Sequence, residues 1–188
     1  RGLGDVYKRQ VLVVNTLADA LERNPREDHR HYLNHFSMRP PELTMELMAE
    51  PDIHITQQPN FTYTLEGRYA ENLDGWRLQH NNPLRGPMDH GITVAISSDI
   101  LPIGPLVGLY AAVTRKGMTG TVYGEDEAIT MEEAIRAYTA LGAYLNFEED
   151  KKGTLEVGKF ADMVLLSEDL LSICLLYTSP SPRDITPS

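Results

Sequence analysis

The sequence contains a single cysteine, Cys174, among its 188 residues. A lone thiol forms neither an internal disulfide nor a multi-thiolate zinc site, so a metal here would need His, Asp or Glu ligands. Long hydrophobic runs are also missing, since no stretch approaches the roughly 20 apolar residues of a membrane helix. Basic residues are few, with 17 Lys and Arg against 27 Asp and Glu and a net charge of -10. This balance argues against nucleic acid or an anionic membrane as a partner.

The two ends of the chain lack the hydrophobic periodicity of the rest. RGLGDVYKRQ (1–10) and CLLYTSPSPR (174–183) can be written as translations of opposite strands of one DNA segment, offset by one base. That segment resembles an adapter used to prepare sequencing libraries. We therefore expect residues 1–10 and 174–188 to be translated adapter. Setting aside their four basic and two acidic residues changes the net charge to -12 and removes the only cysteine.

Hydrophobic spacing over Val11–Ile173 predicts strands that alternate with helices. Strands are predicted over HRHYLNHF (29–36), DIHITQQ (52–58) and ITVAISS (92–98). Helices are predicted over 11–23, from Pro41 onwards, from Asn82-Pro83 to Gly91, over PLVGLYAAVTRK (105–116), and from an N-cap at Thr130 to about Asn146. Residues 60–80 and 117–129 are predicted to be surface loops, the first long enough to act as a binding loop or lid.

The order of these elements predicts an α/β fold with parallel βα units. Residues 11–150 form this α/β part, and residues 151–173 are predicted to leave it as two short strands around Gly158-Lys159. Because no crossover helix separates those two strands, we expect them to join a separate small β module.

Polar side chains follow the predicted strands at their carboxyl ends, where active sites of parallel α/β folds lie. His35 lies at the end of the first strand, and Asp99 follows the third. Both are residue types that bind zinc or a similar divalent ion. Each also has a structural interpretation, His35 as a hydrogen-bonded core histidine and Asp99 as a turn or cap residue. Tyr63 and His80, in the segment 60–80, are weaker candidates for contact with a small-molecule substrate.

Four stretches resemble the C-terminal part of the amidohydrolase superfamily, in the branch called amidohydrolase family 3. They are DHRHYLNHF, ITVAISSDILPIGPLVGLYAAVTRK, EAITMEEAIRAYTALGAYLNFEED and KKGTLEVGKFADMVLLSEDLL. The resemblance implies a partial (β/α)8 TIM barrel, about strands six to eight, followed by the C-terminal strands of a small β-sandwich. It also implies that the enzyme binds a divalent metal ion, with zinc as the first candidate. His35 would be the metal ligand on strand six. Asp99 would be the strand-eight aspartate, which binds metal or the nucleophilic water and acts as general base.

The resemblance implies hydrolysis of a non-peptide carbon–nitrogen bond, an amide or cyclic amide, in a small molecule by metal-activated water. The family's other metal ligands would precede Val11, so we expect the chain to be an inactive C-terminal fragment. Asn34 stands where the family usually has an acidic residue, which implies a different charge beside the metal. Isomerase or deaminase chemistry, or a non-catalytic ligand-binding barrel, are the alternatives. A cytoplasmic location is favoured over secretion, and no oligomeric state is predicted.

Overall fold

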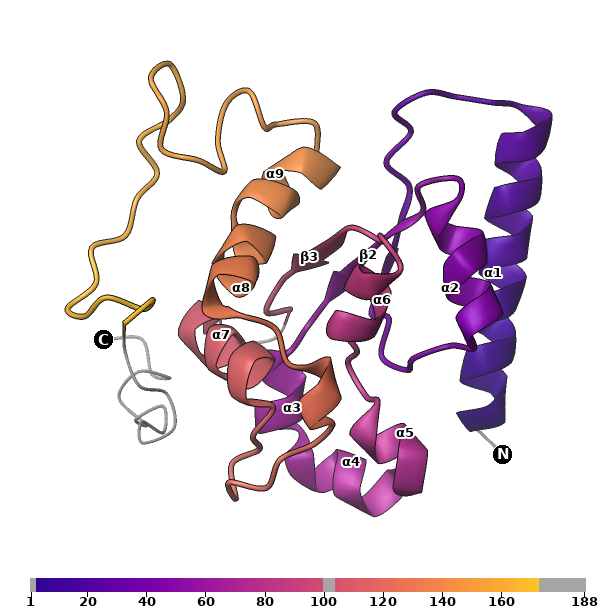
Figure 1. The fold of residues 1–188 in the computed structure, drawn as a ribbon, viewed down its shortest axis with the longest axis horizontal. Coiled ribbons are helices and arrows are strands. Elements are labelled where there is room, and N and C mark those ends of the chain that lie inside the picture. Colours follow the sequence, from indigo (N-terminus) through magenta and orange to yellow (C-terminus); the bar gives the residue numbers. More distant parts are fainter. Residues whose placement is uncertain (1–2, 100–103, 173–188) are drawn as a thin grey trace.

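A computed structural model describes residues 3–99 and 104–172 of the chain (Figure 1). Residues 100–103, which follow Asp99, lie outside the described residues. The C-terminal segment expected to be adapter, 174–188, also lies outside them, as do Arg1 and Gly2.

All three predicted strands are present and form one parallel sheet. They are β1 (Tyr32–Asn34), β2 (His54–Gln57) and β3 (Val94–Ile96), in the order β1-β2-β3. Asn34 pairs with Thr56, and Thr56 with Ala95, so the carboxyl ends of the strands lie at one edge. A mixed α/β chain with a small parallel sheet is thereby confirmed, and its being part of a (β/α)8 barrel stays a prediction.

The predicted helices are also present, with shifted ends. They are α1 (Leu3–Arg23), α2 (Glu42–Ala49), α6 (Arg85–Asp89), α7 (Pro105–Thr114), α8 (Met131–Tyr138) and α9 (Ala140–Leu145). Thr130 caps α8 as predicted, because its hydroxyl accepts from the Glu133 amide while the Glu133 carboxylate accepts from the Thr130 amide. The single helix predicted as far as Asn146 is interrupted at Thr139, between α8 and α9.

The prediction of a long irregular loop over 60–80 is wrong. This segment forms three short helices, α3 (Asn60–Thr64), α4 (Glu66–Asn72) and α5 (Gly75–Gln79). Phe61 and Tyr63 are buried, and α3 packs against α7. The segment mixes aromatic and polar residues without a clear helical period, so its helices depend on tertiary packing more than on amphipathicity. The other predicted loop, 117–129, contains the 3-10 turn η1 (Glu125–Glu127).

The two strands predicted around Gly158-Lys159 are not formed. Residues 151–172 form turns and bends. Their backbone hydrogen bonds include those from the Lys159 amide to the Glu156 carbonyl and from the Phe160 amide to the Lys151 carbonyl. The segment leaves several large apolar side chains exposed: Leu155, Val157, Phe160, Met163, Val164, Leu165 and Leu171. A strand needs a hydrogen-bonded neighbour, and within the described residues none lies beside this segment.

The sheet lies at the centre of the structure, with α1 and α2 on one side and α8 and α9 on the other (Figure 1). Apolar side chains from the strands and these helices form one main core: Val14, Phe36, Met45, Met48, Ile55, Leu84, Val94, Ile96, Leu109, Ala112, Ala134 and Ala137. The helices α3, α4 and α5 follow the carboxyl end of β2, so they surround the edge where the predicted site lies. Within the described parts of the chain, no helix is both long and apolar enough to cross a membrane.

Candidate functional site

His35 and Asp99 lie side by side at the carboxyl edge of the sheet. The Nε2 atom of His35 is 3.8 Å from Oδ1 of Asp99, although 64 positions separate the two residues in the sequence. Their side chains are 45% and 39% exposed, so a solute can reach both. The parallel register explains this proximity, since His35 directly follows β1 and Asp99 lies three positions after the end of β3 in the same sheet.

The spacing of this pair suits one shared cation. Zinc lies about 2.0–2.2 Å from imidazole nitrogen or carboxylate oxygen, which places two ligands of one ion roughly 3–4 Å apart. The ligand set of the pair, one nitrogen and one oxygen, fits a divalent ion of this kind. Within residues 3–99 and 104–172, no third His, Cys, Asp or Glu completes a group of three around them. At least one further ligand would therefore come from residues outside the described ones.

The backbones of both residues adopt an uncommon conformation. His35 has φ 54° and Asp99 has φ 61°, in the left-handed region that residues other than glycine rarely occupy. The His35 ring also stacks on Phe61, with a centroid distance of 6.2 Å and an interplanar angle of 12°. Strained conformations of this kind cluster at functional sites, where the surrounding structure must hold them in place.

A row of polar side chains connects the ends of the three strands behind this pair. The Oδ1 atom of Asn34 accepts hydrogen bonds from the His35 amide at 3.0 Å, from the Thr56 hydroxyl at 2.5 Å and from Nε2 of Gln58 at 3.0 Å. The same Gln58 nitrogen donates to the Ser97 hydroxyl oxygen at 2.8 Å. Gln58 is only 1% exposed, so it ties the three strand ends together from the inside.

The weaker substrate-binding candidates occupy different surroundings. Tyr63 is 6% exposed and meets Tyr110 edge-to-face at 5.9 Å, in a small core with Val107 and Ala111. His80 stacks on Trp76 at 4.3 Å, and its two ring nitrogens face the Trp76 carbonyl and the Asp126 carboxylate. Both residues therefore have structural contacts that account for them, and their role in substrate binding stays a prediction.

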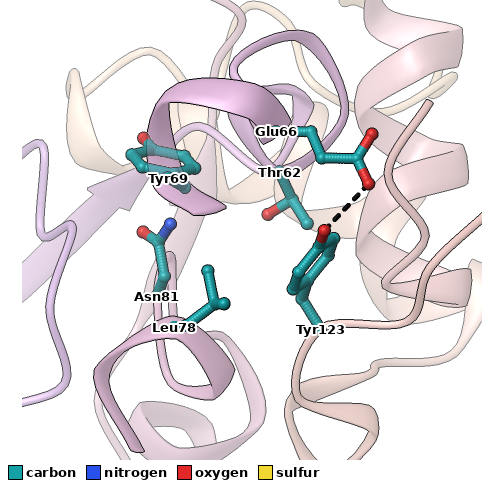
Figure 2. A pocket seen from close by; sticks show the side chains of 6 residues that line it. All are labelled: Thr62, Glu66, Tyr69, Leu78, Asn81 and Tyr123. Atoms are coloured by element: carbon teal, nitrogen blue, oxygen red, sulfur yellow. Dashed lines mark hydrogen bonds between the residues drawn. The ribbon is translucent and has the colours of Figure 1, made fainter. Parts of the chain in front are cut away.

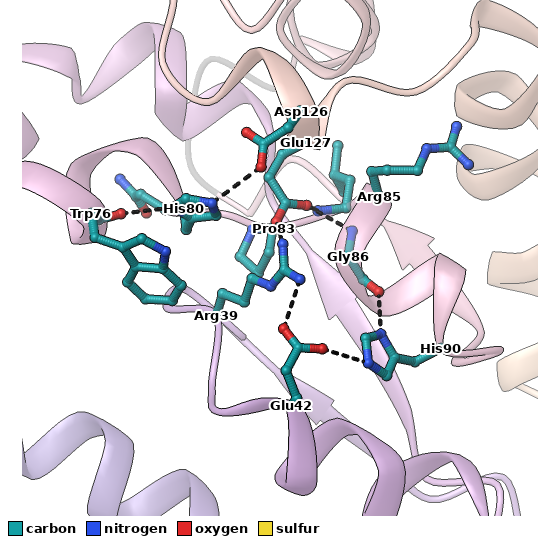
Figure 3. A network of polar contacts seen from close by, with 12 residues as sticks. Arg39, Glu42, Trp76, His80, Pro83, Arg85, Gly86, His90, Asp126 and Glu127 are labelled. Atoms are coloured by element: carbon teal, nitrogen blue, oxygen red, sulfur yellow. Dashed lines mark hydrogen bonds and ion pairs between the residues drawn. The ribbon is translucent and has the colours of Figure 1, made fainter.

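A second group of metal-ligating residue types, which the sequence did not reveal, is formed by His80, Asp126 and Glu127 (Figure 3). Glu127 is fully buried, and its carboxylate accepts from Arg39 and from the amides of Leu84 and Gly86, each at 2.9 Å. These donors already use the oxygens that a cation would need. The Arg39 guanidinium beside them would also repel a cation, so this group fits a structural network better than a metal site.

The same network continues to α2 and α6 through Arg39. Its guanidinium bridges Glu127 and Glu42, and Glu42 also pairs with Nε2 of His90 at 2.7 Å (Figure 3). The other ring nitrogen of His90 faces the Gly86 carbonyl at 2.8 Å. The network thus fixes the connections around the sheet edge without contributing to the His35–Asp99 pair.

Glu66, at the start of α4, anchors the segment 117–123 beside a small cavity (Figure 2). Its carboxylate accepts from the Thr119 amide at 2.9 Å, the Thr119 hydroxyl at 2.6 Å and the Tyr123 hydroxyl at 2.9 Å. Burial acts to raise the pKa of Glu66, but these hydrogen bonds outweigh it and hold the pKa below its usual 4.5. The ionised carboxylate is therefore the form that the folded protein stabilises.

The change Glu66→Gln tests this anchor. We expect it to lower the free energy of unfolding at pH 7 by about 1–3 kcal/mol, because an amide group cannot accept all three bonds. Since the folded pKa lies below the unfolded one, the contribution of Glu66 is present above about pH 4.5 and lost as pH falls through the folded pKa. Urea denaturation across pH 3–7 should give a shallower acid loss in the variant than in wild type. Glu71→Gln, at an exposed position of the same helix, should leave both stability and slope unchanged.

Arg115, at the C-cap of α7, is completely buried. Its guanidinium donates to three backbone carbonyls, those of Tyr123 at 3.0 Å, Asn82 at 2.9 Å and Asn81 at 2.6 Å. Burial lowers the pKa of Arg115 to about 10, while the charges of Glu127 and Asp126 act in the opposite direction. Arg115 thus joins α7, the end of the 75–82 segment and the 117–123 segment at one point.

A larger cavity lies at the other end of the sheet. It has a volume of about 540 Å³ and lies between α1, α2 and the turns before β1 and β2. Its lining includes the polar side chains of Asp19, Glu22, Arg26, His29 and Glu50. It is at the amino ends of the strands and contains none of the candidate site residues, so it is not part of the predicted site.

The fold and the candidate site together define an α/β chain with metal-ligating residue types at the carboxyl edge of parallel strands. The sequence profile described as "Amidohydrolase family" matches residues 7–174. The chain therefore belongs to the amidohydrolase family, as its motifs indicated.

Individual relatives agree with this membership. The chain is 30% identical over 130 residues to N-substituted formamide deformylase of Arthrobacter pascens, covering 65% of this chain and 23% of that protein. It is 30% identical over 177 residues to YtcJ of Bacillus subtilis, named as an amidohydrolase, covering 91% and 32%. Among solved structures, it superposes on an uncharacterized metal-dependent hydrolase from Pyrococcus furiosus with a TM-score of 0.65 and 25% identity, covering 84% and 32%. The chain spans about a quarter to a third of the length of these relatives.

Proposed function

We propose that the chain is the strand-six-to-eight portion of a metal-dependent amidohydrolase. The whole enzyme would hydrolyse a non-peptide carbon–nitrogen bond, an amide or cyclic amide, of a small molecule. The observation that carries this proposal is the approach of His35 and Asp99 to 3.8 Å at the carboxyl edge of the sheet. The name of the Arthrobacter relative, a deformylase of N-substituted formamides, supports the bond type.

His35 and Asp99 are the residues of this chain that would hold the metal. Their spacing, their exposure and their nitrogen–oxygen ligand set fit a divalent ion, and zinc is the ion we propose. When bound, such an ion polarises the carbonyl group and makes water a better nucleophile near neutral pH. Because the pair supplies two ligands, we propose that the rest of the site comes from earlier parts of the complete enzyme.

Asp99 would transfer a proton from the attacking water to the leaving nitrogen. Its carboxylate is 39% exposed and can accept a proton from the attacking water. The same carboxyl group can then give that proton to the leaving nitrogen, so that water and amide become a carboxylic acid and an amine. The left-handed backbone of Asp99, at φ 61°, aims the side chain from the end of β3 towards His35.

The metal requirement is tested on the complete reading frame that contains this chain. Treatment with a chelator should abolish amide hydrolysis, and Zn²⁺ added after dialysis should restore it. Metal content measured by atomic spectroscopy should follow activity through both steps. A short N-substituted formamide is the first probe, because a relative is named for that class. Full activity in metal-free enzyme would refute the proposal, as would a complete reading frame without further His or Asp ligands.

The chain by itself should be inactive, because two ligands do not make a catalytic metal centre. The chain of 188 residues, purified alone and supplied with Zn²⁺, should show no hydrolysis of the same formamide. Hydrolysis by this chain alone would contradict the view that it is a portion of the enzyme.

A further inference from the structure

Asn34 is fixed in one orientation by its neighbours at the ends of the strands. The backbone amide of His35 can only donate, so the Asn34 atom that it meets at 3.0 Å must be the carbonyl oxygen. The Thr56 hydroxyl and Nε2 of Gln58 meet the same oxygen, at 2.5 Å and 3.0 Å. Three donors thus converge on Oδ1, and a flipped amide would place its NH2 group against at least one obligate donor.

The orientation of Gln58 follows from that of Asn34. The Gln58 atom that faces Asn34 Oδ1 must be the amide nitrogen, and its second hydrogen is directed to the Ser97 oxygen at 2.8 Å. The Ser97 oxygen is therefore an acceptor in this row, and its own hydrogen is available to another partner. Gln58, after the middle strand, therefore donates in both directions, to Asn34 on one side and to Ser97 on the other.

The outward side of Asn34 consequently carries its two N–H donors. Asn34 is an exposed residue, directly adjacent to His35, which itself lies beside Asp99. Within the described residues, no acceptor is hydrogen-bonded to this NH2 group. The NH2 group of Asn34 is therefore a donor without a hydrogen-bonded acceptor among the described residues, on the residue that immediately precedes His35.

We propose that Asn34 is a substrate-binding residue that donates its side-chain N–H groups to a carbonyl or carboxylate oxygen. This inference rests on the proposed function, because it assigns Asn34 to the acyl oxygen of the amide substrate or to the carboxylate of the acid product. An acidic residue at position 34 would repel both oxygens. Asn34 therefore makes the edge selective for ligands that carry acceptor oxygens next to the bond that is cleaved.

The test uses acetate as the probe and the complete enzyme as the sample. Asn34→Asp keeps the acceptor oxygen for His35, Thr56 and Gln58 but removes both donors and adds a negative charge. Isothermal titration calorimetry on metal-free enzyme should show acetate affinity at least about tenfold weaker than in wild type, the loss typical of a hydrogen bond to a charged group. Asn24→Asp, the same chemical change at the exposed end of α1, should leave acetate affinity within twofold.

Acetate titration and activity after chelation distinguish failure of this inference from failure of the proposed function. An unchanged acetate affinity in Asn34→Asp, or no acetate binding by the wild type, would overturn the role of Asn34. Activity that survives chelation would instead overturn the proposed function, while the metal-free titration would still decide on Asn34. A second variant, Asn34→Ala, removes the donors without adding charge, and it should also weaken acetate binding. If only the Asp variant is affected, simple charge repulsion explains the result and the inference fails.

Discussion

Asp99→Asn is expected to lower kcat/KM of the complete enzyme by about 10²–10⁴, the usual contribution of a general base. The amide cannot accept the proton of the attacking water and is a poorer metal ligand than the carboxylate. Asparagine tolerates the left-handed conformation, so the backbone at φ 61° and the end of β3 should be retained. Activity and bound metal are measured on the same preparations.

The control for this variant is Asp19→Asn, which makes the same change on the exposed face of α1. It should leave both kcat/KM and metal content at wild-type values. Unchanged activity in Asp99→Asn would remove Asp99 from the proposed chemistry. A variant that loses activity but also its thermal transition would have to be replaced by Asp99→Ser before the role of the carboxylate is judged, and retained activity there would refute it.

Arg115→Met is expected to reduce the free energy of unfolding by about 3–5 kcal/mol, because each of three backbone carbonyls left without its donor costs about 1–3 kcal/mol. Methionine fills part of the volume, but the carbonyls of Asn81, Asn82 and Tyr123 lose their donors in a region without solvent. Native proteins are stable by only about 5–15 kcal/mol, so this single change is a large share of the total. The loss of stability in Arg115→Met is measured from the midpoint of urea denaturation, and the yield of soluble protein should fall with it.

Arg136→Met serves as the matched control, because Arg136 lies exposed on α8. Its effect should stay within about 0.5 kcal/mol. Arg115→Lys should fall between the two, since one ammonium group cannot reach three carbonyls in the way that a planar guanidinium does. Equal stability of the Met variants at positions 115 and 136 would show that the buried guanidinium contributes nothing.

Local sequence patterns predicted the elements that build the sheet edge. The strand ITVAISS is buried throughout its observed part, and the capping box at Thr130 and Glu133 has the expected hydrogen bonds. Both signals act over a few neighbouring residues, which is why they can be read directly. The three short helices in 60–80 were missed because their apolar residues have no helical period of their own, and α3 is held by packing against α7 and α4.

The two strands predicted within residues 151–173 show the opposite error: the local sequence pattern favours strands, but no strand is formed in the described part of this segment. Turn residues and apolar residues favour two strands there, but a strand is stable only when another backbone satisfies its amides and carbonyls. Val157 and Leu165 remain almost fully exposed. The missing neighbour is a tertiary condition that the local pattern does not contain.

The sequence by itself determined which residue types could carry chemistry and where along the strands they stand. It placed His35 at the end of one strand and Asp99 directly after another, and parallel pairing then made their convergence predictable. Only the tertiary structure decided which polar residues stayed accessible at the ends of the strands and which became buried in structural networks. Glu127 and Arg115 read as ordinary charged surface residues, yet both are buried because their partners come from segments about 30 to 90 positions away. Long-range partners decide whether a charge is stable inside a protein, and no local pattern records them.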